Sequence, residues 1–568
     1  MPAPSIRRPS PARVPALRRA GLAVASGLVL AWAFPTHDQW WLAPVAVAAL
    51  SAAVLGATWR LAAGLGLLTG LAFFLPTLSW SGIYVGALPW VALCVLQALY
   101  LAAMAAVTAA VQHPLLGTRL QPLVYAAVPV VWVLQETARS HTPFGGFPWA
   151  RLAFSQADSP LANLAAYAGA PGITFAVAAL GAALHAGIAA LWHRRRARAG
   201  DLGPVGTERV GTERVGRERV GAKGAGRAAY GLAVAVGAAA VLPAAAAVAL
   251  TPPTDGRPVD VLFVQGNVPR PGLDFNAERR RVLDNHVEQT LRGTAGLTRP
   301  PSLVVWPENS SDIDPLRNDD AGAAIRRAVD AAGAPVLVGA VLREPAPRIS
   351  NVSLFYRPGG GEPERYVKQH PVPFAEYIPF RSFFRLLSDK VDLVSSDFAA
   401  GEAPAAFEVP VAGAASYWAV PTICFEVAYD DLMREATLQP GRRDNLLVVQ
   451  TNNATFGYTA ESEQQFAISR IRAIEHGRSV VHVSTVGVSA FIHPDGTVED
   501  KTALFTAAAA HGTPVVRSEV TVSDRIGDAP EWAAALLLLL LAGAARWQAS
   551  RSARVVPHPR TEEEAAVV

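Results

Sequence analysis

The sequence predicts a chain of two parts, an α-helical membrane bundle of about eight spans and an α/β domain of layered strands and helices. Charged residues make up 17% of the 568 residues, against about 25% in a typical soluble domain. Only seven of them lie between Ala20 and Trp192. From residue 251 onward, β-branched apolar runs alternate with helical patterns. The composition excludes a disordered, collagenous or disulfide-framework protein.

Eight apolar stretches approach the length of about 20 residues that a transmembrane helix needs. They are residues 20–35, 41–58, 61–82, 88–111, 121–138, 166–192, 229–250 and 532–545. The last is short, but Trp532 and Trp547 flank it as membrane-interface anchors would. The basic residues before the first stretch also resemble a signal peptide, but the apolar stretches that follow favour an uncleaved first span.

Lys and Arg in short loops predict the orientation, because they favour the cytoplasmic side. With eight spans, Arg60, Arg119, the cluster at 193–198 and both tails fall on one side. The expected organisation is a basic cytoplasmic tail (1–19), a six-helix membrane region (20–192), a flexible repetitive cytoplasmic linker (193–228), a seventh transmembrane helix (229–250), an extracytoplasmic domain (251–528), an eighth transmembrane helix (529–550) and a cytoplasmic tail (551–568). The basic pI of about 9.1 reflects Arg clusters beside anionic lipid, not nucleic acid.

The extracytoplasmic domain shows strand and helix patterns in alternation. Strands are predicted at 259–265, 302–306, 335–341, 353–356, 418–424, 446–450 and 479–484, and helices at 277–294, 321–333 and 463–477. Continuously apolar strands of this kind are buried on both faces, which predicts a layered α/β domain.

Three residues at the ends of predicted strands could perform chemistry: Glu308, Lys368 and Cys424. Each alone could be ordinary, as a turn carboxylate, a surface lysine or an inert thiol. Together they compose a mechanism. A thiol with a pKa of about 8.5 needs a base, which Glu308 can supply. The oxyanion of an acyl intermediate needs a cation or N–H donors, and Lys368 can contribute.

The sequence motifs around these residues resemble those of the nitrilase (carbon–nitrogen hydrolase) superfamily with its Glu-Lys-Cys triad. The motifs are ValValTrpProGlu (304–308), LysGlnHisProValProPheAlaGlu (368–376) and ThrIleCysPheGlu (422–426). Their fusion to seven or eight spans resembles the apolipoprotein N-acyltransferase family. The likeness extends to GlyPheProTrp (146–149), to PheSerGlnAlaAspSerProLeu (154–161) and to ThrAsnAsnAlaThrPheGly (451–457), and covers roughly residues 20–195 and 229–545.

The resemblance implies a nitrilase-like four-layer α-β-β-α sandwich and an acyltransferase with no cofactor and no metal. Cys424 would take a fatty acyl chain from a phospholipid as a thioester, with Glu308 as base and Lys368 at the oxyanion. The acceptor would be the α-amino group of the diacylglyceryl-cysteine of a lipoprotein, on the outer side of a bacterial cytoplasmic (inner) membrane. Glu376 and Glu426 match two further acidic positions of the family.

Three positions depart from the family pattern: Phe425 in place of a frequent Tyr, Thr455 in place of an aromatic residue, and Ala375 in place of Gly. They bear on the shape of the lipid pocket and not on the reaction class. Two alternatives stay open, a membrane-tethered amidase or hydrolase that passes its thioester to water, and a non-catalytic membrane scaffold. The sequons at Asn309, Asn351 and Asn453 are read as chance occurrences.

Overall fold

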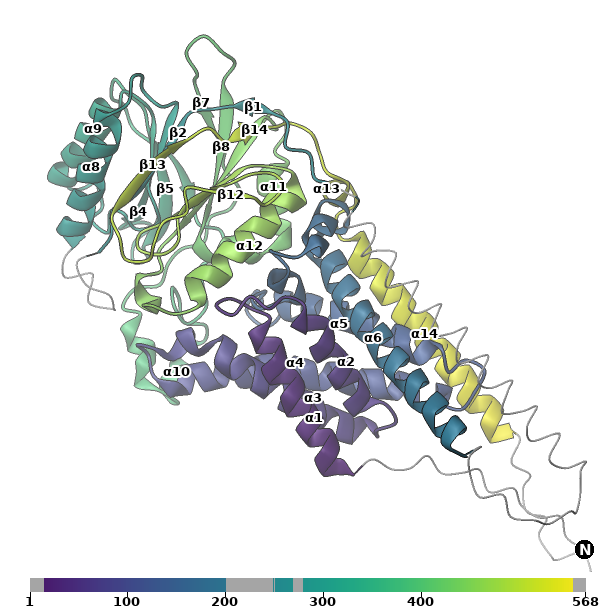
Figure 1. Cartoon of the computed structure of the whole chain (residues 1–568). Coiled ribbons are helices and arrows are strands. Elements are labelled where there is room, and N and C mark those ends of the chain that lie inside the picture. The colour runs from purple at the N-terminus through teal and green to yellow at the C-terminus, as the bar shows by residue number, and fades with distance from the viewer. Residues whose placement is uncertain (1–14, 201–248, 250, 269–278, 555–568) are drawn as a thin grey trace, which may run out of the picture.

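The structure is a computed structural model that describes residues 15–200, 249, 251–268 and 279–554 (Figure 1). Most of the predicted linker 193–228, and the predicted seventh span 229–250 apart from Ala249, lie outside the described residues. So do most of the two tails, 1–14 and 555–568.

In the part of the chain that the structure describes, long helices build the membrane part (Figure 1). They are α1 (Ala16–Trp32), α2 (Leu42–Val54), α3 (Trp59–Thr77), α4 (Ala87–Gln112), α5 (Leu123–His141), α6 (Ala165–Gly200) and α14 (Ala529–Arg554). Among the described residues, four helices are long and apolar enough to cross a membrane: Trp59–Thr77, Ala87–Leu115, Pro160–Trp192 and Ala529–Arg551. The helix Leu42–Val54 is shorter.

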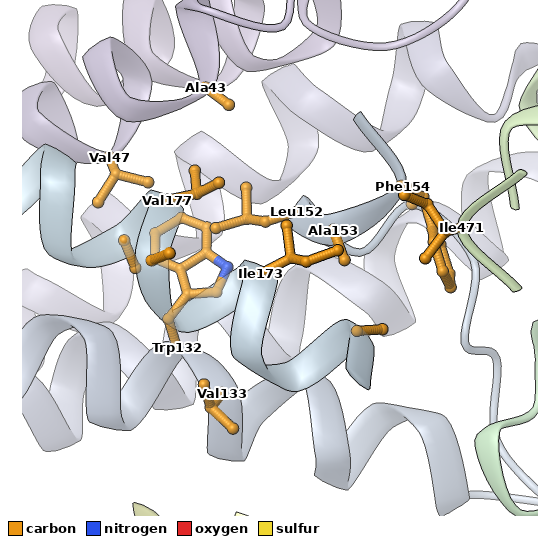
Figure 2. Close-up of a cluster of buried hydrophobic side chains, with 14 of the residues drawn as sticks. Ala43, Val47, Trp132, Val133, Leu152, Ala153, Phe154, Ile173, Val177 and Ile471 are labelled. Carbon is orange, nitrogen blue, oxygen red and sulfur yellow. The ribbon is translucent and has the colours of Figure 1, made fainter. Parts of the chain in front are cut away.

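Small residues allow the membrane helices to pack closely. A Cβ atom on Gly66 of α3 would lie 2.3 Å from the carbonyl oxygen of Leu101 on α4, so only glycine permits this approach. Helices α5 and α6 enclose a core around Trp132, Ile173 and Val177 (Figure 2). The same cluster includes Ile471 of the α/β domain, so the two parts share one continuous core.

The α/β domain contains two six-stranded sheets. The first has the order β13-β2-β3-β4-β5-β6, with bounds Ala508–Gly512, Val261–Gln265, Leu303–Val305, Val336–Leu342, Ser350–Tyr356 and Glu364–Val367. The second has the order β12-β11-β10-β9-β8-β7, with bounds Val498–Glu499, Ala490–Ile492, Val480–Ser484, Asn445–Thr451, Tyr417–Ile423 and Phe407–Val409. Strands β2, β3 and β4 run parallel in one sheet, and β8, β9 and β10 run parallel in the other.

Two helical layers cover the paired sheets. Helices α8 (Arg279–Ala295) and α9 (Asp319–Ala332) pack on the first sheet, and α11 (Asp430–Thr437) and α12 (Glu461–His476) pack on the second (Figure 1). Apolar residues of both inner faces, such as Phe263, Phe355 and Phe491, fill the space between the sheets. This arrangement confirms the expected four-layer α-β-β-α sandwich. Helix α12 lies between the second sheet and the membrane bundle (Figure 1).

Candidate functional site

The structure brings the three strand-end residues together where the two sheets meet. Glu308 follows β3, Lys368 follows β6 directly, and Cys424 follows β8 directly. Lys368 Nζ lies 3.4 Å from Glu308 Oε1, and the two side chains are buried, with 1% and 4% of their residues' surface exposed. Gly339 on β4 allows this geometry, because a Cβ there would lie 2.2 Å from the Pro307 carbonyl oxygen.

Glu376 is a second carboxylate in contact with Lys368, after Glu308. Lys368 Nζ donates to Glu376 Oε1 at 2.9 Å, and the backbone N–H of Val372 donates to Glu376 Oε2 at 2.7 Å. Asn351 on β5 joins the two carboxylates, because its Nδ2 donates to Glu308 at 2.7 Å and to Glu376 at 3.1 Å. The sequence signalled Asn351 only as a sequon, so its place between two acidic side chains was missed.

The charges in this cluster are strongly coupled. Burial by itself would lower the pKa of Lys368, but the Glu376 and Glu308 carboxylates raise it above its ordinary value. Lys368 is therefore a fixed cation at neutral pH. Burial raises the pKa of Glu308, and the charge of Lys368 opposes that rise. A carboxylate with a raised pKa is a stronger base than an exposed one.

Cys424 occupies a strained backbone position at the start of a 3-10 turn (Cys424–Ala428). Its φ of 56° lies in the left-handed region, which a side chain with a Cβ rarely adopts. Part of the surface of residue Cys424 is exposed, whereas Glu308 and Lys368 are buried. Burial, followed by the charge of Glu308, raises the pKa of Cys424, so the resting thiol is protonated and needs a base to become a nucleophile.

Glu426 does not touch Lys368 but fixes the loops on either side of it. Its carboxylate accepts the backbone N–H of Ile423 at 2.7 Å and that of Gln369 at 2.7 Å. It also accepts the N–H of His370 at 3.1 Å and the hydroxyl of Tyr366 at 2.9 Å. These donors come from the loop that follows Lys368 (the lysine loop, residues 368–376) and from the end of β8. Glu426 therefore holds the lysine loop next to the cysteine turn.

The loop between α5 and α6 of the membrane part reaches the residue after Cys424. Trp149 stacks on Phe425 with ring centroids 5.1 Å apart and an interplanar angle of 9°, and Phe147 stacks at 5.4 Å. The indole N–H groups of Trp149 and Trp80 both donate to Gln464 Oε1 on α12, at 2.8 and 3.1 Å. One edge of the cysteine turn is therefore built from membrane-part residues.

Ion pairs also connect the α5–α6 loop, Asp430 after the cysteine turn, and α12. Arg151 from the same loop donates to both oxygens of Asp430, at 2.8 and 2.6 Å. Arg472 of α12 contacts Asp430 at 2.6 Å and donates to the Val427 and Ala428 carbonyl oxygens. Burial alone would raise the pKa of Asp430, but the two arginines hold it below its ordinary value. The cysteine turn is thus held from the membrane side and from α12.

An apolar segment beside the lysine loop is exposed. It runs from Phe374 to Leu393, includes α10 (Arg381–Arg385), and presents Phe380, Phe383, Leu386, Leu387 and Leu393 to the surroundings. Phe144 of the membrane part packs edge-on against Phe374 and Phe380. Figure 1 shows α10 beside the membrane bundle. The sequence did not signal this segment, because its apolar residues follow neither a strand nor a long-helix period.

The three residues that depart from the family pattern lie in loops of the α/β domain. Phe425 is the ring that stacks on Trp149. Thr455 lies in the 3-10 turn Ala454–Phe456, and the neighbouring Phe456 packs edge-on against Trp80 at 5.1 Å. Ala375 precedes Glu376 in the lysine loop. Among the residues that the structure describes, no group of three His, Cys, Asp or Glu side chains is placed to hold a metal ion.

Comparisons with known proteins agree with both parts of the chain. Residues 26–183 match the family described as the apolipoprotein N-acyltransferase N-terminal domain, and residues 286–507 match the carbon–nitrogen hydrolase family. An apolipoprotein N-acyltransferase from Mycolicibacterium smegmatis is 37% identical over 89% of this chain and 81% of its own length. One from Ralstonia nicotianae is 30% identical over 93% of this chain and 94% of its own.

Among solved structures, a mutant amidase of the nitrilase superfamily from Nesterenkonia AN1 aligns with 48% of this chain and 94% of its own at 16% identity. The TM-score is 0.34, which is too low to place any residue.

Proposed function

Because this chain belongs to the apolipoprotein N-acyltransferase family, we propose that it moves a fatty acyl chain from a membrane phospholipid to the α-amino group of a lipoprotein's diacylglyceryl-cysteine. The observation that carries this proposal is the contact of Lys368 with Glu308 beside a cysteine turn that the membrane part helps to build. A hydrolase of soluble substrates would need no such junction.

In the first half-reaction, Cys424 Sγ attacks the ester carbonyl carbon of the phospholipid. Glu308 takes the thiol proton, and Lys368 stabilises the oxyanion that forms on the carbonyl oxygen. Collapse breaks the ester C–O bond, and Glu308 returns the proton to the departing oxygen. The products are a thioester on Cys424 and a lysophospholipid.

In the second half-reaction, the α-amino group of the acceptor attacks the thioester carbonyl carbon. Glu308 takes a proton from the attacking nitrogen, and Lys368 again faces the oxyanion. The C–S bond breaks, the proton passes to the departing sulfur, and an amide joins the acyl chain to the lipoprotein. Glu376 and Glu426 serve as positioning residues, because Glu376 contacts Lys368 and Glu426 ties the two loops.

We also propose that the chain spans a bacterial cytoplasmic membrane about eight times, with the α/β domain on the outer side. Both tails and the linker 193–228 would then be cytoplasmic, as the Lys and Arg distribution favours. The exposed apolar segment 374–393 supports a site that opens towards lipid, because large apolar side chains are stable there when a bilayer covers them. An apolar entrance also keeps water from the thioester.

The test is to incubate purified protein with a phospholipid labelled in its acyl chain and to look for a hydroxylamine-sensitive adduct. Cys424→Ala is the control. An adduct that persists in water and passes to a diacylglyceryl peptide supports the transferase. Rapid release of free fatty acid would instead support the hydrolase, and the absence of an adduct in the unmodified protein would contradict both.

A further inference from the structure

A series of hydrogen bonds, all donated in one direction, ends at the sulfur of Cys424. The backbone N–H of Gly487 donates to Ser484 Oγ at 2.8 Å, and Ser484 Oγ donates to Asn453 Oδ1 at 2.5 Å. Asn453 Nδ2 donates to Gln465 Oε1 at 3.0 Å. Gln465 Nε2 then donates to Cys424 Sγ at 3.7 Å, a distance suited to the large sulfur atom.

The direction of this chain is fixed at its far end. A backbone N–H can only donate, so Ser484 Oγ accepts from Gly487 and keeps its own proton for the bond to Asn453 Oδ1. The Asn453 amide nitrogen then faces acceptors, which are Glu461 Oε2 at 2.7 Å and Gln465 Oε1. Thr451 Oγ1 donates to the same Gln465 oxygen at 2.8 Å. Gln465 can therefore present only its NH₂ group to the sulfur.

The residues of this hydrogen-bond series are buried and closely packed. Ser484, Asn453, Gln465 and Thr451 are all buried, so water does not compete for their donors. A Cβ on Gly487 would lie 2.2 Å from Asn453 Oδ1, so glycine is required at that position. Hydrogen bonds in a buried chain polarise one another, which strengthens the last donor.

We propose that Gln465 is a positioning residue that orients Cys424 Sγ and stabilises its thiolate through an N–H···S hydrogen bond. The proposal rests on the nucleophilic role proposed for Cys424. The titratable groups facing the thiol are Glu308 and Lys368 from the first sheet and Glu461 from α12. Glu376 lies behind Lys368, and Glu426 lies on the cysteine's own turn.

The charges around the sulfur explain why a neutral donor is useful. Glu308 disfavours a thiolate and Lys368 favours it, and Glu461 adds to the repulsion only once it ionises, because burial raises its pKa to about 8. Lys368 is already engaged by Glu376 and Glu308, at 2.9 and 3.4 Å. The amide of Gln465 approaches from α12, away from that ion pair, and adds a donor for the thiolate without adding a charge to a crowded site.

The test measures the reactivity of the thiol itself. Full-length protein in detergent, with the buried Cys94→Ala change as background, is treated with iodoacetamide over a range of pH, and the alkylation of Cys424 is followed. Gln465→Met keeps the size of the side chain and removes the donor. A hydrogen bond to a charged group is worth enough to move the midpoint of alkylation upward by about one pH unit.

Gln439→Met is the matched control, because Gln439 is another buried glutamine of the α/β domain, and its amide donates to the Ala405 and Ala436 carbonyl oxygens instead of the sulfur. A profile for Gln465→Met that overlies the parent, or an equal shift in Gln439→Met, would overturn the inference. If Gln465→Met does not fold, Gln465→Leu removes the donor without adding a charge, and its midpoint must move upward as well.

The same proteins separate this inference from the proposed function. A shifted alkylation profile in a protein that forms no acyl adduct with phospholipid would contradict the proposed function and leave the role of Gln465 standing. An unshifted profile for Gln465→Met, in a protein whose parent forms the acyl adduct, would contradict the role of Gln465 and leave the proposed function standing.

Discussion

The rings of Trp149 and Phe425 lie nearly parallel, 5.1 Å apart, although one belongs to the membrane part and the other directly follows Cys424. The stack places the cysteine turn against the α5–α6 loop. A movement of that loop would therefore displace Phe425, the residue next to Cys424. The membrane part contributes to the shape of the site as well as to its location.

Trp149→Leu should destabilise the protein and slow formation of the acyl-enzyme. The change removes the stack on Phe425 and the hydrogen bond to Gln464, and large-to-small changes at buried aromatics cost about 3 kcal/mol. Thermal unfolding and acyl-adduct formation provide the measurements. Trp532→Leu is the control, because Trp532 is exposed, and it should change both quantities little. Equal effects of the two changes would contradict a special role for the stack.

Lys368→Met should reduce acyl-adduct formation by about 100-fold or more, because it removes the cation proposed to face the oxyanion. It also leaves Glu308 and Glu376 buried without their partner, so thermal stability should fall. The exposed Lys390 offers the same substitution as a control. A Lys368→Met protein that forms the adduct at the parent rate would contradict the assigned role.

Asp430→Asn should destabilise the protein more than a surface change does, because it leaves the buried Arg151 and Arg472 with only Glu136 and Glu475 as partner carboxylates. Asp431→Asn at the next position is the matched control. Its side chain is 59% exposed, and its contacts with His141 and Arg434 are surface pairs worth little. Chemical or thermal unfolding of the two variants gives the comparison. A larger loss for Asp431→Asn would show that the contact between the membrane part and the cysteine turn does not depend on the buried pairs.

Glu461 should make stability depend on pH. Burial raises the pKa of Glu461 to about 8, so the folded protein holds a proton that the unfolded chain releases at an ordinary pKa of about 4.3. Its contribution is fully present below the unfolded pKa and is lost as the pH rises towards 8, by at most about 1.4 kcal/mol per pH unit. Glu461→Gln keeps an acceptor for Asn453 and should flatten the decline in melting temperature.

Glu463→Gln controls for that measurement, because Glu463 lies on the same helix but is partly exposed and paired with Lys501. Its melting profile should keep the parent's slope between pH 5 and about 8. If Glu461→Gln also keeps that slope, burial of Glu461 does not produce the pH dependence.

The interior of the α/β domain could be predicted from sequence because its parallel strands are continuously apolar. Predicted runs at 418–424 and 446–450 correspond to β8 and β9. Edge strand β13, Ala508–Gly512, carries little strand preference of its own, and its pairing with β2 makes it a strand. Such context is non-local and is invisible in a short window of sequence.

The candidate site was predictable to the same extent. Glu308 and Cys424 follow strands that the apolar patterns predict, whereas β6, which ends directly before Lys368, is not among the predicted strands. Asn351 and Gln465 are ordinary polar residues in a strand and a helix, and only the fold turns them towards Glu308 and Cys424. The structure also separates the roles of two acidic residues, because Glu376 contacts Lys368 whereas Glu426 accepts backbone donors.

The pairing of Arg151 with Asp430 has a consequence for how the protein is made. The two residues are 279 positions apart, so Arg151 is synthesised and delivered to the membrane long before its partner exists. Until then, Glu136 at 3.6 Å is the carboxylate within the membrane part that can compensate it. The contact between the membrane part and the cysteine turn through Asp430 can therefore form only after the later domain has been synthesised.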